Sequence, residues 1–138
     1  MNFVKYAALV PAFCLLPLAS AMADVRLDVR NDSTEDCSVA LHARADKTRW
    51  ITQGWYVFVS GEEAPIILEG VTDIHNVYLY HDCGMKLPED ADTKKAYVKV
   101  NRMFMDDIPK EGDRDYEEVT FVRLNVPNYT IENNTPGA

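Results

Sequence analysis

Short runs of alternating apolar and polar residues, separated by turn signals, constrain the fold of this chain most. Val25, Leu27 and Val29 alternate with charged residues, and the run from Cys37 to Arg44 has the same period of two. This period is typical of a β-strand with one buried face. Further strands are expected over residues 50–59, 65–68, 74–83, 97–105 and 119–126. About seven short strands without an amphipathic helix predict an all-β fold, an antiparallel β-sandwich, with a small β-barrel as the alternative.

The first 23 residues have the organisation of a secretory signal peptide. Lys5 gives a positive start, residues 7–18 are almost wholly apolar, and Ala21-Met22-Ala23 forms a small-residue cleavage site. The apolar run is too short to span a bilayer. We therefore expect bacterial export to the periplasm or the medium, a single β domain over residues 24–127, and a flexible C-terminal tail over residues 128–138.

The expected mature chain is acidic. Removing the leader leaves 138 − 23 = 115 residues with 13 basic and 22 acidic side chains, a formal charge of 13 − 22 = −9. Such a surface repels phosphate backbones and anionic lipids, which argues against nucleic-acid and membrane partners. It suits high solubility, and it also complements another exported protein with a basic surface. The sequence does not indicate an oligomeric state.

Two of the three cysteines, Cys37 and Cys83, lie outside the leader. An even number of cysteines in an exported chain predicts a disulfide bond, with two separate buried thiols as the alternative. The bridge would close a loop of some 46 residues, for which chain entropy gives about 4 kcal/mol of stabilisation.

The densest aromatic segment contains Trp50 and Trp55, with Gly54 directly before the second tryptophan. Their odd separation places the two side chains on opposite faces of a regular strand. A β-bulge at Gly54 would return them to one face. Both tryptophans can pack in the core, or at least one can be exposed and bind a sugar or a partner's side chain.

A pattern of aromatic and glycine residues spans about half of the expected mature chain, at Asn31, Trp50, Gly54-Trp55-Tyr56, Gly61, Tyr78 and Tyr80. This pattern resembles that of a bacterial family known as the domain of unknown function numbered 1036. The resemblance implies a small exported β domain and supplies no established activity. Arg30 and Glu63 stand where the family tends to have cysteines, so the resemblance implies that an opposite-charge pair replaces one disulfide.

No catalytic motif is recognisable, and we expect neither a metal nor a cofactor. His75 and His81 share a strand face but are roughly 20 Å apart, too far to hold one ion. The acidic run from Asp106 to Glu118 lacks the regular ligand spacing of a calcium loop. It is expected to be a solvated loop, with a contact surface for a cationic partner as the alternative. The candidate binding residues are Trp50, Trp55, His81, Asp82, Asp106, Asp107, Asp113 and Asp115.

These observations predict an exported, non-enzymatic protein that binds another macromolecule. Two alternatives stay open. The first is an immunity or inhibitor protein against an exported toxin or hydrolase. The second is a small envelope hydrolase, which would require His81, Asp82 and a tyrosine hydroxyl to converge in one cleft.

Overall fold

The computed structural model describes residues 24–46, 48–100, 102–106 and 114–132, and the predicted leader lies outside these ranges. The described part contains nine strands and one 3-10 helix. In chain order they are β1 (Val25–Asn31), β2 (Cys37–Arg44), β3 (Trp50–Phe58), β4 (Glu63–Leu68), η1 (Ile74–Asn76), β5 (Val77–His81), β6 (Thr93–Lys99), β7 (Phe104–Asp106), β8 (Tyr116–Arg123) and β9 (Asn128–Ile131).

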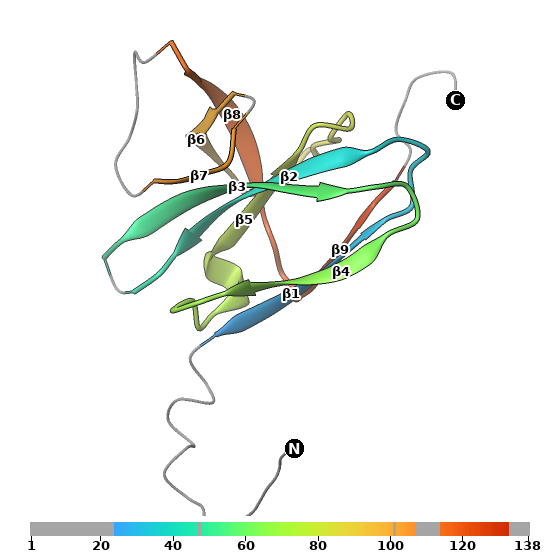
Figure 1. Ribbon diagram of the computed structural model, residues 1–138. Helices are drawn as coiled ribbons and strands as arrows, with labels where there is room; N and C mark the ends of the chain where they lie inside the picture. The colour runs from blue at the N-terminus through green and yellow to red at the C-terminus, as the bar shows by residue number, and fades with distance from the viewer. Residues whose placement is uncertain (1–23, 47, 101, 107–113, 133–138) are drawn as a thin grey trace, which may run out of the picture.

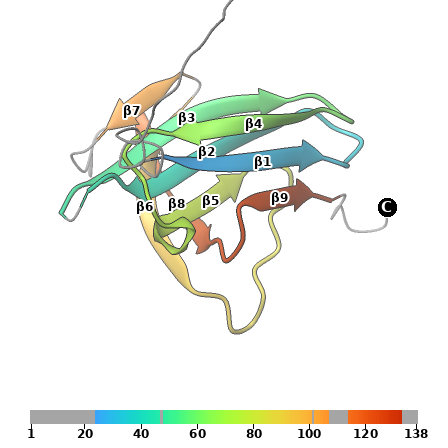
Figure 2. The ribbon, with the colours of Figure 1, turned by 90° about the horizontal axis from the view of Figure 1, so that it is seen from below.

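The strands form two sheets that pack face to face (Figures 1 and 2). The smaller sheet has the order β4-β1-β9, and the larger has the order β6-β8-β5-β2-β3-β7. The larger sheet curls so far that β6 contacts β3, although the two strands are not hydrogen-bonded neighbours. The predicted all-β fold is confirmed. The architecture combines both expected forms, because one sheet of the sandwich is curled into a half-barrel.

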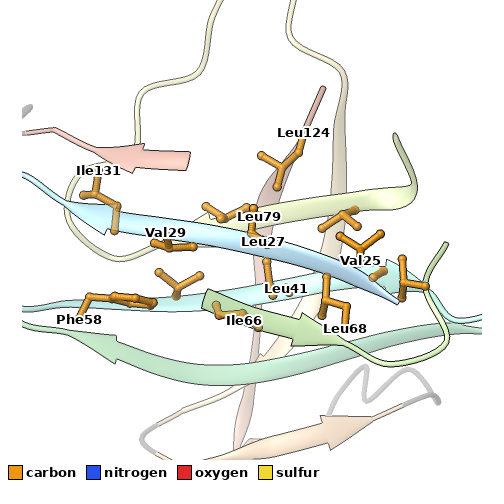
Figure 3. Close-up of a cluster of buried hydrophobic side chains, with 14 of the residues drawn as sticks. Val25, Leu27, Val29, Leu41, Phe58, Ile66, Leu68, Leu79, Leu124 and Ile131 are labelled. Carbon is orange, nitrogen blue, oxygen red and sulfur yellow. The ribbon is translucent and has the colours of Figure 1, made fainter. Parts of the chain in front are cut away.

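The first hydrophobic core lies between the two sheets (Figure 3). Its side chains come from alternate positions of β1, β2 and β5, which is the period-two pattern of the sequence. The fully buried members include Leu27, Val29, Leu41 and Leu79. Ile66 and Leu68 of β4 close the core on one side.

The predicted flexible tail is wrong for residues 128–131. Asn128–Ile131 form β9, which pairs in parallel with β1 through the register Asp28↔Asn128 to Asn31↔Ile131. The Ile131 side chain is fully buried in the first core. The domain therefore continues at least to Ile131, and the smaller sheet is mixed rather than purely antiparallel. Residues 133–138 of the predicted tail lie outside the described ranges.

Two expected strands are shorter than predicted. The run 97–105 divides into β6 and β7, which occupy opposite ends of the strand order in the larger sheet. The run 74–83 begins as η1, because the Asp73 carboxylate accepts a hydrogen bond from the His75 backbone N–H and caps a helical turn there.

The predicted disulfide is present between Cys37 and Cys83, whose Cα atoms are 5.6 Å apart. It joins the start of β2 to the residues after β5. Arg30 and Glu63 face one another in the β1–β4 register. The Arg30 guanidinium nevertheless donates its hydrogen bond to Asp32, at 2.7 Å. Asp32 is the main cause that raises the pKa of Arg30, and Glu63 makes a smaller contribution.

Candidate functional site

The concave face of the larger sheet carries a second hydrophobic core that is rich in aromatic rings. Its buried members are Ala40, Tyr78, Ala96, Val98, Phe104 and Phe121, and Trp50, Trp55, Tyr80 and Val119 pack against them. β2 and β5 are therefore covered on both faces, by the smaller sheet on one side and by the curl of their own sheet on the other.

Gly54 brings the two tryptophans to this one face. The β2–β3 register passes from Val39↔Tyr56 to Leu41↔Gln53, so Gly54 and Trp55 together lie opposite Ala40. This extra residue is a β-bulge, the alternative that the sequence left open at Gly54, and the side-chain alternation resets across it. A Cβ atom at position 54 would lie 3.2 Å from the Ala40 Cβ and 3.2 Å from a Phe104 ring carbon. The close approach of Ala40 and Phe104 favours glycine at this position.

The aromatic side chains of this second core form what we call the aromatic row, with Trp50 at one end and Trp55 at the other. Other side chains of this chain cover the Trp50 ring. The His42 ring stacks on it with centroids 4.9 Å apart, and the Lys94 Nζ lies 3.3 Å from the Trp50 ring centroid. Burial is the main cause that lowers the pKa of His42 to about 4, and the positive charge of Lys94 adds to it. His42 also shares a 2.8 Å hydrogen bond with the Thr52 hydroxyl. Trp50 is therefore a packed structural residue whose cation partner comes from this chain.

At the other end of the row, a pocket of about 470 Å³ opens beside Trp55 and Tyr80. Its lining comes from β2, β3 and β8, from the end of β5 and from the connection between β6 and β7. We call it the sheet-end pocket, and it is lined by Ser38, Trp55, Val57, Tyr80, Asp82, Val100, Arg102, Met103, Glu117 and Val119. A pocket of this size is in the range that accepts a small ligand or part of a peptide.

The rim of the sheet-end pocket is apolar and exposed. The Met103 side chain is 81% exposed and Val57 is 60% exposed, and Val100 is also exposed. Trp55 forms a fixed wall, because its indole Nε1–H donates a 2.8 Å hydrogen bond to the Lys99 carbonyl oxygen. Tyr80 packs against it at 63°, with ring centroids 6.0 Å apart.

Two carboxylates and one guanidinium line the same pocket. The Asp82 Oδ1 accepts a 2.8 Å hydrogen bond from the Ser38 backbone N–H, which orients this carboxylate. Burial raises the pKa of Tyr80, and the negative charges of Asp82 and Glu117 raise it further. Both carboxylates therefore act on the same aromatic wall. Arg102 is the third charged group of the pocket, and no ion pair between two described residues joins it to Asp82 or Glu117.

Of the residues selected from the sequence, Trp55 and Asp82 lie together in the sheet-end pocket, and Trp50 lies at the far end of the row. Asp106 accepts a 2.8 Å hydrogen bond from the Tyr116 hydroxyl, and Asp115 is exposed before β8. Asp107 and Asp113 lie outside the described residues. Among the described acidic residues of the run 106–118, Glu117 lines the pocket, and Asp106, Asp115 and Glu118 do not.

Sequence reasoning did not select Tyr80, Arg102 or Glu117 as site residues. Tyr80 could have been selected, because it lies two residues before Asp82 and side chains two residues apart in a strand face the same side. Glu117 reaches the pocket only because β8 pairs with β5.

The structure does not bring His81 and Asp82 into one cleft. The His81 side chain is 1% exposed, and its Nδ1 accepts a hydrogen bond from the Cys83 backbone N–H at 3.1 Å. The His81 ring lies 5.8 Å from the Tyr129 ring of β9, whereas Asp82 lines the sheet-end pocket. His81 and Asp82 therefore do not form the shared cleft that the sequence analysis considered.

No group of three or more His, Cys, Asp or Glu side chains in the described ranges is arranged to hold a metal ion. Within the same ranges, no helix has the length and apolarity needed to cross a membrane.

No protein-family model matches this chain, and neither a curated protein nor a solved structure shows significant similarity to it. The resemblance to the family numbered 1036 thus depends on the quoted residues alone.

Proposed function

We propose that this chain is an exported, non-enzymatic bacterial domain that binds another exported protein through the sheet-end pocket. The observation that carries the proposal is the open pocket of about 470 Å³ with aromatic walls and an exposed apolar rim. Large contiguous apolar patches on a protein surface often mark a binding site. Val57 and Met103 are both more than half exposed, and they line the pocket that contains Trp55.

The export part of the proposal is supported by the leader-like N-terminus and by the Cys37–Cys83 bond. Disulfide bonds persist in oxidising compartments such as the periplasm and the extracellular space. The resemblance to the family numbered 1036 agrees with a small exported β domain.

The expected partner has a basic surface. The whole chain has a formal charge of −8, and the pocket itself contains two carboxylates against one guanidinium. Electrostatic complementarity of this kind accelerates association and selects partners.

A photo-crosslinking amino acid at position 103 tests the proposal in the cells that make the protein. The matched control places the same amino acid at position 126, because Val126 is also an exposed apolar residue (52%) and does not line the pocket. We expect one discrete adduct with an exported protein from position 103 and none from position 126. No adduct at position 103, or the same adducts from both positions, would contradict the proposal.

A further inference from the structure

We infer that the sheet-end pocket receives an arginine side chain of the partner, which lies on Trp55 and Tyr80 and pairs with Asp82 and Glu117. The inference rests on the proposed function, because it names the chemical group that the same pocket recognises.

The aromatic row of the larger sheet already binds one cation. At the closed end, the Lys94 ammonium of this chain lies 3.3 Å from the Trp50 ring centroid. At the open end, Trp55 has aromatic neighbours, Tyr80 and Phe104, and no described cation lies over its ring. Trp is the aromatic side chain that attracts a cation most strongly. At Trp50 the ring is contacted by His42 and Lys94 of this chain, whereas at Trp55 a pocket lies beside the ring.

Two carboxylates give the open end a negative potential. Asp82 directly follows β5 and Glu117 belongs to β8, and their charges add to burial in raising the pKa of Tyr80. The Asp82 Oδ1 is oriented by the Ser38 backbone N–H, and no described residue donates a hydrogen bond to its Oδ2. A cation in the pocket therefore meets carboxylate oxygens as well as ring faces.

The combination of aromatic rings and carboxylates in the lining favours a guanidinium over an ammonium. A guanidinium is planar, stacks on aromatic faces and donates several hydrogen bonds in one plane, whereas an ammonium is a compact and strongly hydrated charge. The pocket also has more room than one arginine side chain needs. The exposed rim residues Val57, Val100 and Met103 can cover an apolar residue that flanks the arginine in the partner.

Arg102 is the competitor within this chain. It lines the same pocket and carries the same charge as the expected ligand. Removing the Arg102 side chain is expected to tighten binding of a cationic peptide, because the pocket then carries less positive charge. The direction of this change in affinity distinguishes a cation site from an anion site, because an anion would bind more weakly after the loss of Arg102.

The test uses the capped tripeptide acetyl-Leu-Arg-Leu-amide as the probe, with NMR of the isotope-labelled protein as the readout. The indole N–H signal of Trp55 reports the pocket, and that of Trp50 is the internal control, since Trp50 lies at the closed end. The matched peptide contains citrulline, which has nearly the shape of arginine and no charge. We expect saturable shifts of the Trp55 signal, an unmoved Trp50 signal, and roughly tenfold weaker binding of the citrulline peptide.

Charge variants complete the test. E117Q is expected to weaken binding of the arginine peptide about twofold to fivefold, as for an exposed ion pair. E118Q is the matched control, because Glu118 is the next residue of β8, is also exposed and does not line the pocket. R102Q is expected to strengthen binding by a similar factor. An unchanged Trp50 signal in each variant shows that the protein remains folded.

Equal binding of the citrulline peptide, equal effects of E117Q and E118Q, or weaker binding by R102Q would each overturn the inference. If position 103 crosslinks a partner while the arginine peptide does not bind, the inference fails and the proposed function stands. If the arginine peptide binds and position 103 yields no adduct, the proposed partner is refuted. The claim that the pocket receives an arginine of that partner is then refuted as well.

Discussion

Acidification from pH 7 to pH 5 is expected to destabilise this fold through His42. The ring is held between Trp50, Tyr78 and Phe121, and it has the positive charge of Lys94 nearby. Protonation therefore places a second positive charge in a partly desolvated site. The pKa of His42 is about 4 in the folded protein, compared with the ordinary value of 6.5.

The sign of the effect follows from proton binding. Between pH 6.5 and pH 4 the unfolded chain binds a proton at position 42 and the folded protein does not, so stability falls as the pH falls. One pKa unit corresponds to about 1.36 kcal/mol, which gives about 3 kcal/mol below both pKa values and about 2 kcal/mol at pH 5. His42 keeps some contact with solvent, so we halve the latter figure and expect a loss of about 1 kcal/mol at pH 5.

Urea unfolding followed by far-ultraviolet circular dichroism at pH 7, 6 and 5 measures this loss. The matched variant is H42Q, because glutamine does not titrate and can keep a hydrogen bond to the Thr52 hydroxyl. Burial also lowers the pKa of His81, which contributes in the same direction in both proteins and cancels in the difference. Asp46 and Asp73 have lowered pKa values and titrate below this pH window.

The decisive quantity is the difference between the two proteins in how stability changes with pH. The wild type is expected to lose about 1 kcal/mol more than H42Q between pH 7 and pH 5. Parallel curves would refute the argument, because His42 would then have the same pKa in the folded and unfolded states.

Three further predictions concern the stability of the fold. Replacing Cys37 and Cys83 by alanine is expected to lower the free energy of unfolding by about 4 kcal/mol, and an unchanged urea midpoint would contradict the role of the bridge. I131A is expected to cost about 2–5 kcal/mol because the side chain is fully buried, whereas T130A on the same strand should cost much less; similar losses would contradict the placement of β9. G54A is expected to cost about 1–3 kcal/mol, since the added Cβ meets its neighbours at 3.2 Å, and a melting temperature equal to wild type would argue against the close approach.

Features that depend on local pattern were predictable from the sequence. The alternation in β1 and β2 predicted which side chains face the first core, since neighbouring residues of a strand point to opposite faces. The odd separation of Trp50 and Trp55 placed them on opposite faces of a regular strand, with a bulge at Gly54 as the alternative, and the register shift opposite Ala40 is that alternative. The pairing of Cys37 with Cys83 followed from the number of cysteines and the expected compartment.

Features that depend on pairing between distant segments were not predictable in the same way. β9 has one fully buried side chain, Ile131, and its other residues are as polar as those of a flexible tail. It forms a strand because it pairs with the edge of β1, which lies far from it in the sequence. His42 lies on the face of β2 that points away from the first core. It is partly buried because the sheet curls over it and brings β6 towards β3.

The amino-acid sequence by itself determined the all-β class, the approximate positions of most strands and the disulfide partners. These follow from a period of two and from a count of thiols. Only the tertiary structure decided that Asp82 and Glu117 share one pocket with Trp55. Their proximity requires the pairing of β5 with β8 and the curl of the sheet, and both depend on the packing of side chains that lie far apart in the chain.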